Sequence, residues 1–278
     1  MLKRFLLLTI IGLFSCQEEV PISTNQPPMR TNPLNNLDLD KLSKEEFEKD
    51  SNDFKHIMSY ANDLMFHNQF QNSLYYYNKA LRILPDRKAE VYYAKADVLN
   101  MMKQYDSCFH YYSLAAEIGN KSEYYKTKAN LQNLYKRRPD LALIDINKAI
   151  ELDPKDEENY FMRGVYKSEL KDYKGALKDM RTIPPNHIND PQVYDRRANV
   201  YLNLKLYKDC VADCDIGISI NSQYARLFAL RGIAKSLMDQ TDSACEDILK
   251  ACELGCEEVS NDCVKCKKYL EKKKTKKV

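Results

Sequence analysis

The sequence predicts an all-α fold built from a repeated helical hairpin, and three observations support this prediction. First, an aromatic residue, a basic residue three positions later and then a small residue recur as a signature, in clear copies that begin at Tyr92, Tyr125, Tyr160, Tyr194 and Phe228. The small residues of these copies and of a degenerate first copy are 35, 33, 35, 34 and 34 positions apart, at Ala61, Ala96, Ala129, Gly164, Ala198 and Gly232. Second, the apolar residues inside each unit follow a helical rather than an alternating pattern. Third, 7 glycines and no tryptophan, against 20 tyrosines, suit long helices packed through aromatic side chains. A period near 34 residues with this pattern is typical of helix-turn-helix arrays.

The first residues predict an export signal. Lys3 and Arg4 precede an apolar run from Phe5 to Phe14 that is too short to span a bilayer as a mature helix. The run ends in Leu13-Phe14-Ser15-Cys16, which resembles the lipobox of bacterial lipoproteins. The resemblance implies that residues 1–15 are a lipoprotein signal peptide and that Cys16 is the lipidation site. An ordinary secretory signal with an incidental cysteine is the alternative.

The resemblance to lipoproteins also implies a place in the bacterial cell envelope. No aspartate follows Cys16, which disfavours retention in the inner membrane, and Gln17-Glu18-Glu19 is similar to the acidic leader of some surface lipoproteins. We therefore expect a lipid anchor in the outer membrane, with the chain either periplasmic or exposed on the cell surface. Residues 16–42 are rich in proline and small polar residues, which predicts a flexible tether.

Residues 43–256 are expected to form the repeat array. A capping box at Ser43-Lys44-Glu45-Glu46 predicts the start of its first helix. The first helix of each unit carries the signature, and the second helix carries another small residue about twelve positions later, at Ser73, Cys108, Ala142, Ala176, Cys210 and Ala244. One turn further along are Tyr77, Tyr112, Ile146, Met180, Cys214 and Ile248, followed by Ala80, Ala115, Ala149, Ile183, Gly217 and Ala251. Small residues at facing positions let two helices approach closely, so these residues predict a core seam and not ligands.

The second helices resemble those of the tetratricopeptide repeat (TPR) family. The residues that carry the resemblance are Tyr105-Asp106-x-Cys108 through Ala115, and Ala142 through Ile146 and Ala149 to Pro154. The resemblance covers about Asp53 to Cys256. It implies a right-handed TPR superhelical solenoid of about six helix-turn-helix repeats. Residues 257–274 are then expected to form a capping helix, with a basic tail to residue 278.

The resemblance also implies where a ligand binds. TPR arrays hold partners mainly in a concave groove lined by the first helices, which here would present Met58, Asn62, Tyr93, Asp97, Lys126, Asn130, Phe161, Val165, Asp195 and Asn199. This mixture suits an extended peptide or a partner helix, and ordinary solvated helix positions are the alternative. A clamp for a carboxylate tail is not expected, because Lys126 and Asn130 have no matching basic and amide pair on the neighbouring first helices.

Five of the nine cysteines lie close together near the end of the chain, at Cys245, Cys252, Cys256, Cys263 and Cys266. Outside the cytosol such a cluster more often forms disulfides than a metal site. Cys245 with Cys266 is the expected pair, and no metal is expected. A zinc site formed by Cys252-x3-Cys256 and Cys263-x2-Cys266 is the alternative, although this spacing departs from the common paired Cys-x2-Cys pattern.

Catalysis is not expected. The chain has no glycine-rich phosphate loop, nucleophile elbow or His-Glu-x-x-His motif, and its four histidines are scattered, so neither an enzyme nor a cofactor is predicted. The tail from Lys267 holds seven lysines against Glu271, which predicts a solvated end, with contact to anionic lipid or polysaccharide as the alternative. Nucleic-acid binding is disfavoured by the exported location.

We therefore expect a non-catalytic scaffold for protein–protein interaction. In this reading a lipid-anchored TPR protein binds peptide segments of an envelope partner in its concave groove. The alternative is a factor for outer-membrane assembly or a regulator of a peptidoglycan enzyme.

Overall fold

The computed structural model describes residues 53–182 and 189–275, which form helices and no β-strand. The described residues up to Tyr166 belong to one compact unit and those from Lys167 onward to another. The proposed signal peptide, Cys16, the tether and the helix start at Ser43 lie outside the described residues.

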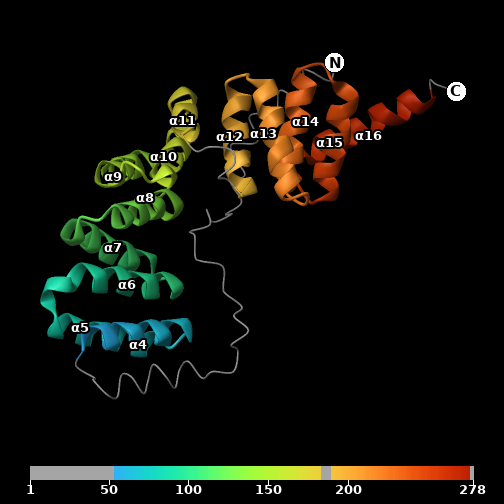
Figure 1. Cartoon of the computed structure of the whole chain (residues 1–278). Coiled ribbons are helices and arrows are strands. Elements are labelled where there is room, and N and C mark those ends of the chain that lie inside the picture. The colour runs from blue at the N-terminus through green and yellow to red at the C-terminus, as the bar shows by residue number, and fades with distance from the viewer. Residues whose placement is uncertain (1–52, 183–188, 276–278) are drawn as a thin grey trace. The chain divides into compact units, whose positions relative to one another are not determined.

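The first unit is a succession of helical hairpins in which each first helix packs on the helix that follows it (Figure 1). The pairs are α4 (Phe54–Phe66) with α5 (Phe70–Ile83), α6 (Lys88–Met101) with α7 (Tyr105–Gly119), and α8 (Ser122–Lys136) with α9 (Pro139–Leu152). A short 3₁₀ helix, η1 (Pro85–Arg87), joins α5 to α6, and α10 (Glu157–Glu169) follows α9.

The second unit continues the pattern after a shorter helix, α11 (Tyr173–Met180). Its hairpins are α12 (Pro191–Asn203) with α13 (Tyr207–Ile220), and α14 (Ala225–Leu237) with α15 (Thr241–Glu253). The 3₁₀ helix η3 (Glu257–Val259) leads into the last helix, α16 (Ser260–Thr275), which packs against α15.

The turns inside the hairpins share one backbone feature that the sequence reasoning missed. Each has a single residue in the left-handed region, with φ between 51° and 66°, at Asn68, Lys103, Arg137, Lys171, Lys205 and Asp239. Such a residue ends a helix by turning the chain sharply, and glycine usually takes this role because it has no Cβ. The glycine-poor composition therefore concealed a turn that recurs with nearly the period of the signature.

The predicted core seam is confirmed by burial. The small residues of both helices are buried, and the larger residues one turn further along the second helices are at most 2% exposed. Gly232 shows why the position must be small: a Cβ there would lie 2.9 Å from Cγ1 of Ile248 and 3.0 Å from the backbone oxygen of Ala244. Of the predicted seam residues, Ile183 alone lies outside the described part of the chain.

Candidate functional site

The basic residue of the signature has a structural role in four of the units. In three of them its partner is a buried aspartate on the second helix, at Asp145, Asp213 or Asp247. A fourth buried aspartate, Asp179, belongs to the same series, whose members are 34 residues apart. Arg197 donates two hydrogen bonds to Asp213, at 2.7 and 3.0 Å, and Lys128 donates one to Asp145 at 3.1 Å. Burial raises the pKa of Asp213, and Arg197 opposes that rise. The regular spacing of these aspartates was visible in the sequence and could have predicted them.

Two repeats depart from the pairing of the signature residue with an aspartate. Asp179 accepts from Lys167, which lies one turn after the signature arginine. In the second hairpin Tyr111 replaces the aspartate, and Nζ of Lys95 lies 4.3 Å from the centre of its ring. The signature thus stabilises the hairpins, and ligand-binding residues must lie on other faces of the helices.

The first unit presents most of the predicted groove residues to solvent. Six residues of α4, α6 and α8 are partly exposed, and we call them the α4–α8 surface: Met58, Asn62, Tyr93, Asp97, Lys126 and Asn130. Asn199 of the second unit is also partly exposed.

Three predicted groove residues are instead buried. The exposed fraction is 8% for Phe161, 1% for Val165 and 2% for Asp195. The sequence pattern placed them one position around the helix from the signature, but their side chains are covered by neighbouring groups. A peptide could reach them only after the protein rearranged.

Two tyrosines of the second helices hold polar side chains of the α4–α8 surface in place. Tyr77 donates its hydroxyl hydrogen to Oδ1 of Asn62, and Tyr112 donates to Oδ1 of Asp97. Both tyrosines come from the core seam, so the core determines where these two surface groups lie.

The surroundings of Asp97 disfavour the charged form of its carboxyl group. Burial raises its pKa to about 6, the hydrogen bond from Tyr112 opposes this rise, and the nearby Glu123 adds to it. A carboxylate whose pKa is raised by folding lowers stability at neutral pH.

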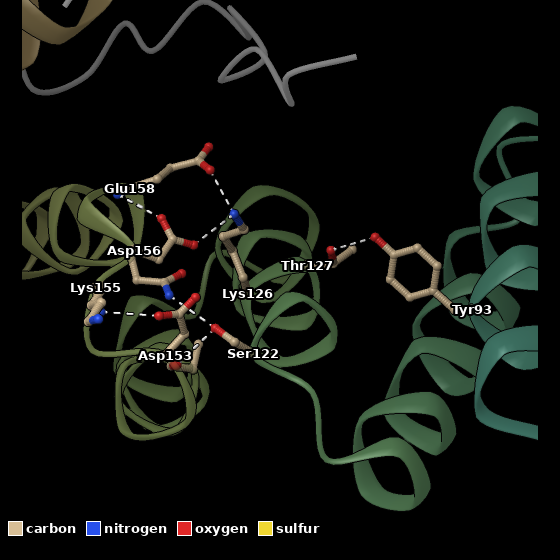
Figure 2. A network of polar contacts seen from close by, with 10 residues as sticks. Tyr93, Ser122, Lys126, Thr127, Asp153, Lys155, Asp156 and Glu158 are labelled. Atoms are coloured by element: carbon tan, nitrogen blue, oxygen red, sulfur yellow. Dashed lines mark hydrogen bonds and ion pairs between the residues drawn. The ribbon is translucent and has the colours of Figure 1, made fainter. Parts of the chain in front are cut away.

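Tyr93 joins two hairpins on the same surface. Its ring stacks on Tyr124 with centroids 4.9 Å apart and meets Tyr112 edge-on at 5.2 Å. Its hydroxyl lies 3.0 Å from Oγ1 of Thr127 on α8 (Figure 2). These contacts hold the ring in one orientation.

Lys126 is neutralised by its neighbours. Its Nζ donates to Oε2 of Glu158 at 2.7 Å and to Oδ2 of Asp156 at 3.2 Å, at the start of α10 (Figure 2). Burial would lower the pKa of Lys126, but the two carboxylates outweigh it and raise the pKa. An ammonium held in this way is a poor receptor for a carboxylate tail.

Asp195 takes part in an internal network of the second unit. Its Oδ2 accepts from Arg226, and Nε of Arg226 lies 3.4 Å from Oε2 of Glu258. The three charges connect α12 and α14 with η3, which explains why Asp195 is buried.

The cysteines near the end of the chain form two disulfides between α15 and α16. Cys245 is joined to Cys266, the expected pair, with Cα atoms 5.1 Å apart. Cys252 is joined to Cys263, with a Cα separation of 6.7 Å, a pair that the sequence did not predict. Burial, followed by the charge of Glu258, raises the pKa of the free Cys256 to about 11. Both disulfides take thiols from the alternative zinc set, and the described residues hold no group of three or more histidine, cysteine or acidic side chains that could bind a metal.

A shallow pocket of about 390 Å³ lies on the first hairpin. Its lining residues are Tyr60, Leu64, Gln69, Asn72, Tyr75 and Tyr76. The lining has no carboxylate, histidine or lysine, and its three tyrosines are the titratable groups that it offers.

Among the described residues, no helix is both long and apolar enough to cross a membrane.

Comparison with known proteins shows the fold. No family model matches the chain. A TPR protein from Parabacteroides merdae aligns with a TM-score of 0.53 at 17% identity, over 82% of this chain and 90% of that one. The chain therefore has the tetratricopeptide-repeat fold.

Sequence relatives cover less of the chain. RNA polymerase II-associated protein 3 of Xenopus tropicalis is 30% identical over 130 residues, which are 46% of this chain and 19% of that protein. Hsc70-interacting protein 1 of Drosophila melanogaster is 31% identical over 70 residues, which are 25% of this chain and 19% of that protein. The chain thus matches about a fifth of the length of each relative.

Proposed function

We propose that this chain is a lipid-anchored, non-catalytic scaffold of the bacterial cell envelope. In this proposal Cys16 carries the lipid, and the α4–α8 surface binds a peptide segment of another envelope protein. The anchor is inferred from the lipobox-like sequence, and the binding surface from the geometry of the first unit.

The binding proposal rests mainly on the raised pKa of the Asp97 carboxyl. The chain keeps a carboxylate with a pKa of about 6 on this surface, where an asparagine could accept the same hydrogen bond without a charge. A residue that lowers stability is often retained because it serves function. A partner that donates an N–H to Asp97, or places a cation beside it, would satisfy the charge.

The surroundings of Asp97 suit a peptide. Tyr93 offers aromatic contact area that its stacking has already ordered, so that little side-chain entropy is lost on binding. Asn62 and Asn130 can hydrogen-bond to peptide backbone, because a side-chain amide both donates and accepts. Since Lys126 is neutralised by two carboxylates, an acidic tail is disfavoured and a neutral or basic segment is favoured.

The names of the sequence relatives support protein binding. One relative is described as associated with RNA polymerase II and another as interacting with Hsc70. A chain held in the envelope would bind a different protein through the same kind of repeat.

The binding surface is tested by cross-linking in intact cells followed by mass spectrometry, with partner capture as the readout. We expect Asp97→Asn combined with Asn130→Ala to reduce capture at least tenfold, since loss of a central hot-spot residue costs about 2 kcal/mol or more and about 1.4 kcal/mol is tenfold. The matched control is Asp106→Asn combined with Asn72→Ala, which makes the same chemical changes at exposed positions on α7 and α5. Equal capture by both variants would remove the α4–α8 surface as the binding site.

The anchor is tested separately by the mass of the chain purified from membranes. We expect the mature chain to begin at Cys16 and to carry acyl groups, which Cys16→Ser should abolish. A mature chain that lacks acyl groups would show an ordinary secretory signal instead.

A further inference from the structure

We propose that α16 is a second membrane contact, in which exposed lysines bind the anionic headgroups of the leaflet that holds the lipid anchor. The contact surface consists of Lys267, Lys268 and Lys272, which we call the α16 lysine face. This inference rests on the lipid anchor proposed above and adds a second point of attachment.

The two disulfides make α16 part of the folded protein and not a loose tail. Cys263 and Cys266 are 6% and 1% exposed and link α16 to α15. Sγ of Cys263 also lies 3.4 Å from the backbone oxygen of Ile248, and Val259 at the start of this segment is fully buried. The helix runs to Thr275, so the lysines from Lys267 to Lys273 lie on an ordered helix.

The opposite side of α16 is open to solvent. The exposed residues follow one another at helical steps, at Val264, Lys267, Lys268, Glu271 and Lys272. Figure 1 shows that α16 starts beside α15 and that its later turns extend past it. The lysine face is thus presented by an ordered helix.

The charges on α16 divide into two groups. Lys265 and Lys273 are paired, the first with Asp262 at 2.8 Å and the second with Asp242 on α15. The three residues of the α16 lysine face form no ion pair among the described residues, and Glu271 is the single acid on that side. Lys276 and Lys277 follow in the sequence and add to the positive charge at this end.

The chemistry of this face favours a lipid surface over a defined partner site. Lysine is a compact charge on a flexible stem, which suits diffuse attraction to many headgroups, whereas bidentate recognition of a single anion would favour arginine. Val264, which is 53% exposed, lies one turn from Lys267 and Lys268 and can enter the interface beside them. An anchor at Cys16 tethers the whole chain to the membrane, so contact by α16 becomes an intramolecular step with a raised effective concentration.

The natural absence of tryptophan provides a sharp test. Val264→Trp places the one indole of the chain on α16, and the full lipidated protein is reconstituted into vesicles that contain brominated lipids as quenchers. We expect quenching and a blue shift in vesicles of phosphatidylcholine mixed with phosphatidylglycerol, but not in phosphatidylcholine alone. High salt should reverse both effects, because the Debye length falls from ~10 Å at 0.1 M to ~3 Å at 1 M.

Charge variants identify the contacting residues. Changing the three residues of the α16 lysine face to glutamine should lower the equilibrium constant for contact about 100-fold, at about fivefold per lysine. The matched control changes Lys174, Lys178 and Lys208, which are also exposed in the second unit, and should leave quenching unchanged. A second reporter, Ile144→Trp on α9, tests for quenching that is not specific to α16.

Several outcomes would overturn the proposal. The first is equal quenching in both kinds of vesicle, and the second is an equal loss of quenching in the two lysine variants. The third is binding of α16 to an acidic protein or polysaccharide without any response to vesicles. Flotation with phosphatidylcholine vesicles reports the acyl anchor alone, so failure of the anchor is distinguished from failure of the α16 contact.

Discussion

Replacing Asp97 by asparagine should stabilise the protein at neutral pH and change it little at pH 4. Folding raises the pKa of this carboxyl from 3.8 to about 6, so the folded state binds the proton more tightly than the unfolded state does. The contribution of Asp97 to the free energy of unfolding is therefore most favourable below pH 3.8 and is lost as the pH rises through 6. At 1.36 kcal/mol per pKa unit, this shift corresponds to about 3 kcal/mol at pH 7.

The asparagine variant isolates this contribution. Its Oδ1 can still accept from Tyr112, but it carries no charge to be desolvated or repelled by Glu123. We expect the free energy of unfolding of the variant to exceed that of the natural protein by up to about 3 kcal/mol at pH 7, and by only about 0.6 kcal/mol at pH 4. Urea unfolding of both proteins, followed by helical circular dichroism between pH 4 and pH 7, measures this difference, because the other titrating groups cancel.

Asp106→Asn serves as the control for this experiment. The Asp106 side chain is 96% exposed and pairs with Lys136, so its loss should change stability by less than about 1 kcal/mol. A difference for Asp97→Asn that stays constant with pH, or a variant less stable than the natural protein at pH 7, would refute the reasoning.

Three further predictions concern the packing of the hairpins. Arg197→Ala should cost about 3–5 kcal/mol because Asp213 would remain buried without its partner, whereas Arg197→Met with Asp213→Leu should recover most of that loss in the same urea assay. Cys245→Ser with Cys266→Ser should lower the free energy of unfolding by about 2–4 kcal/mol. Alkylation of the denatured, nonreduced natural protein should modify four cysteines of the described segment, whereas modification of eight would rule out both disulfides. Gly232→Ala should destabilise by about 1–3 kcal/mol because the added Cβ meets the facing helix, and an unchanged melting temperature would show that the helices can separate without loss.

The candidate site shows how far sequence reasoning reached. The six residues of the α4–α8 surface were identified from their positions relative to the signature, and the structure leaves them partly exposed. Phe161, Val165 and Asp195 were placed by the same rule and are buried. The exposure of a side chain depends on which side chains of the neighbouring repeats cover it. The repeat pattern carries no information about these covering side chains.

For the charged pairs as well, the sequence predicts one part and only the structure shows the other. The sequence displayed four aspartates at 34-residue intervals, but only their burial beside Lys128, Lys167, Arg197 and Arg231 shows what they do. The sequence places Lys126 in the groove, but Asp156 and Glu158, just before and at the start of α10, neutralise its charge. Charged partners that come from the next hairpin depend on how neighbouring repeats pack. The residues at these contacts differ from one repeat to the next.

The sequence by itself determined the class of fold, the period of the hairpins and the seam of small and apolar residues. It could do so because close helix packing places the same steric demand on every repeat, and the demand recurs in the sequence at the period of the structure. The tertiary structure decided which groove positions reach solvent, which charges are neutralised, and that a second disulfide holds α16 in place. Those properties arise from contacts between residues far apart in the chain, where the repeats differ from one another.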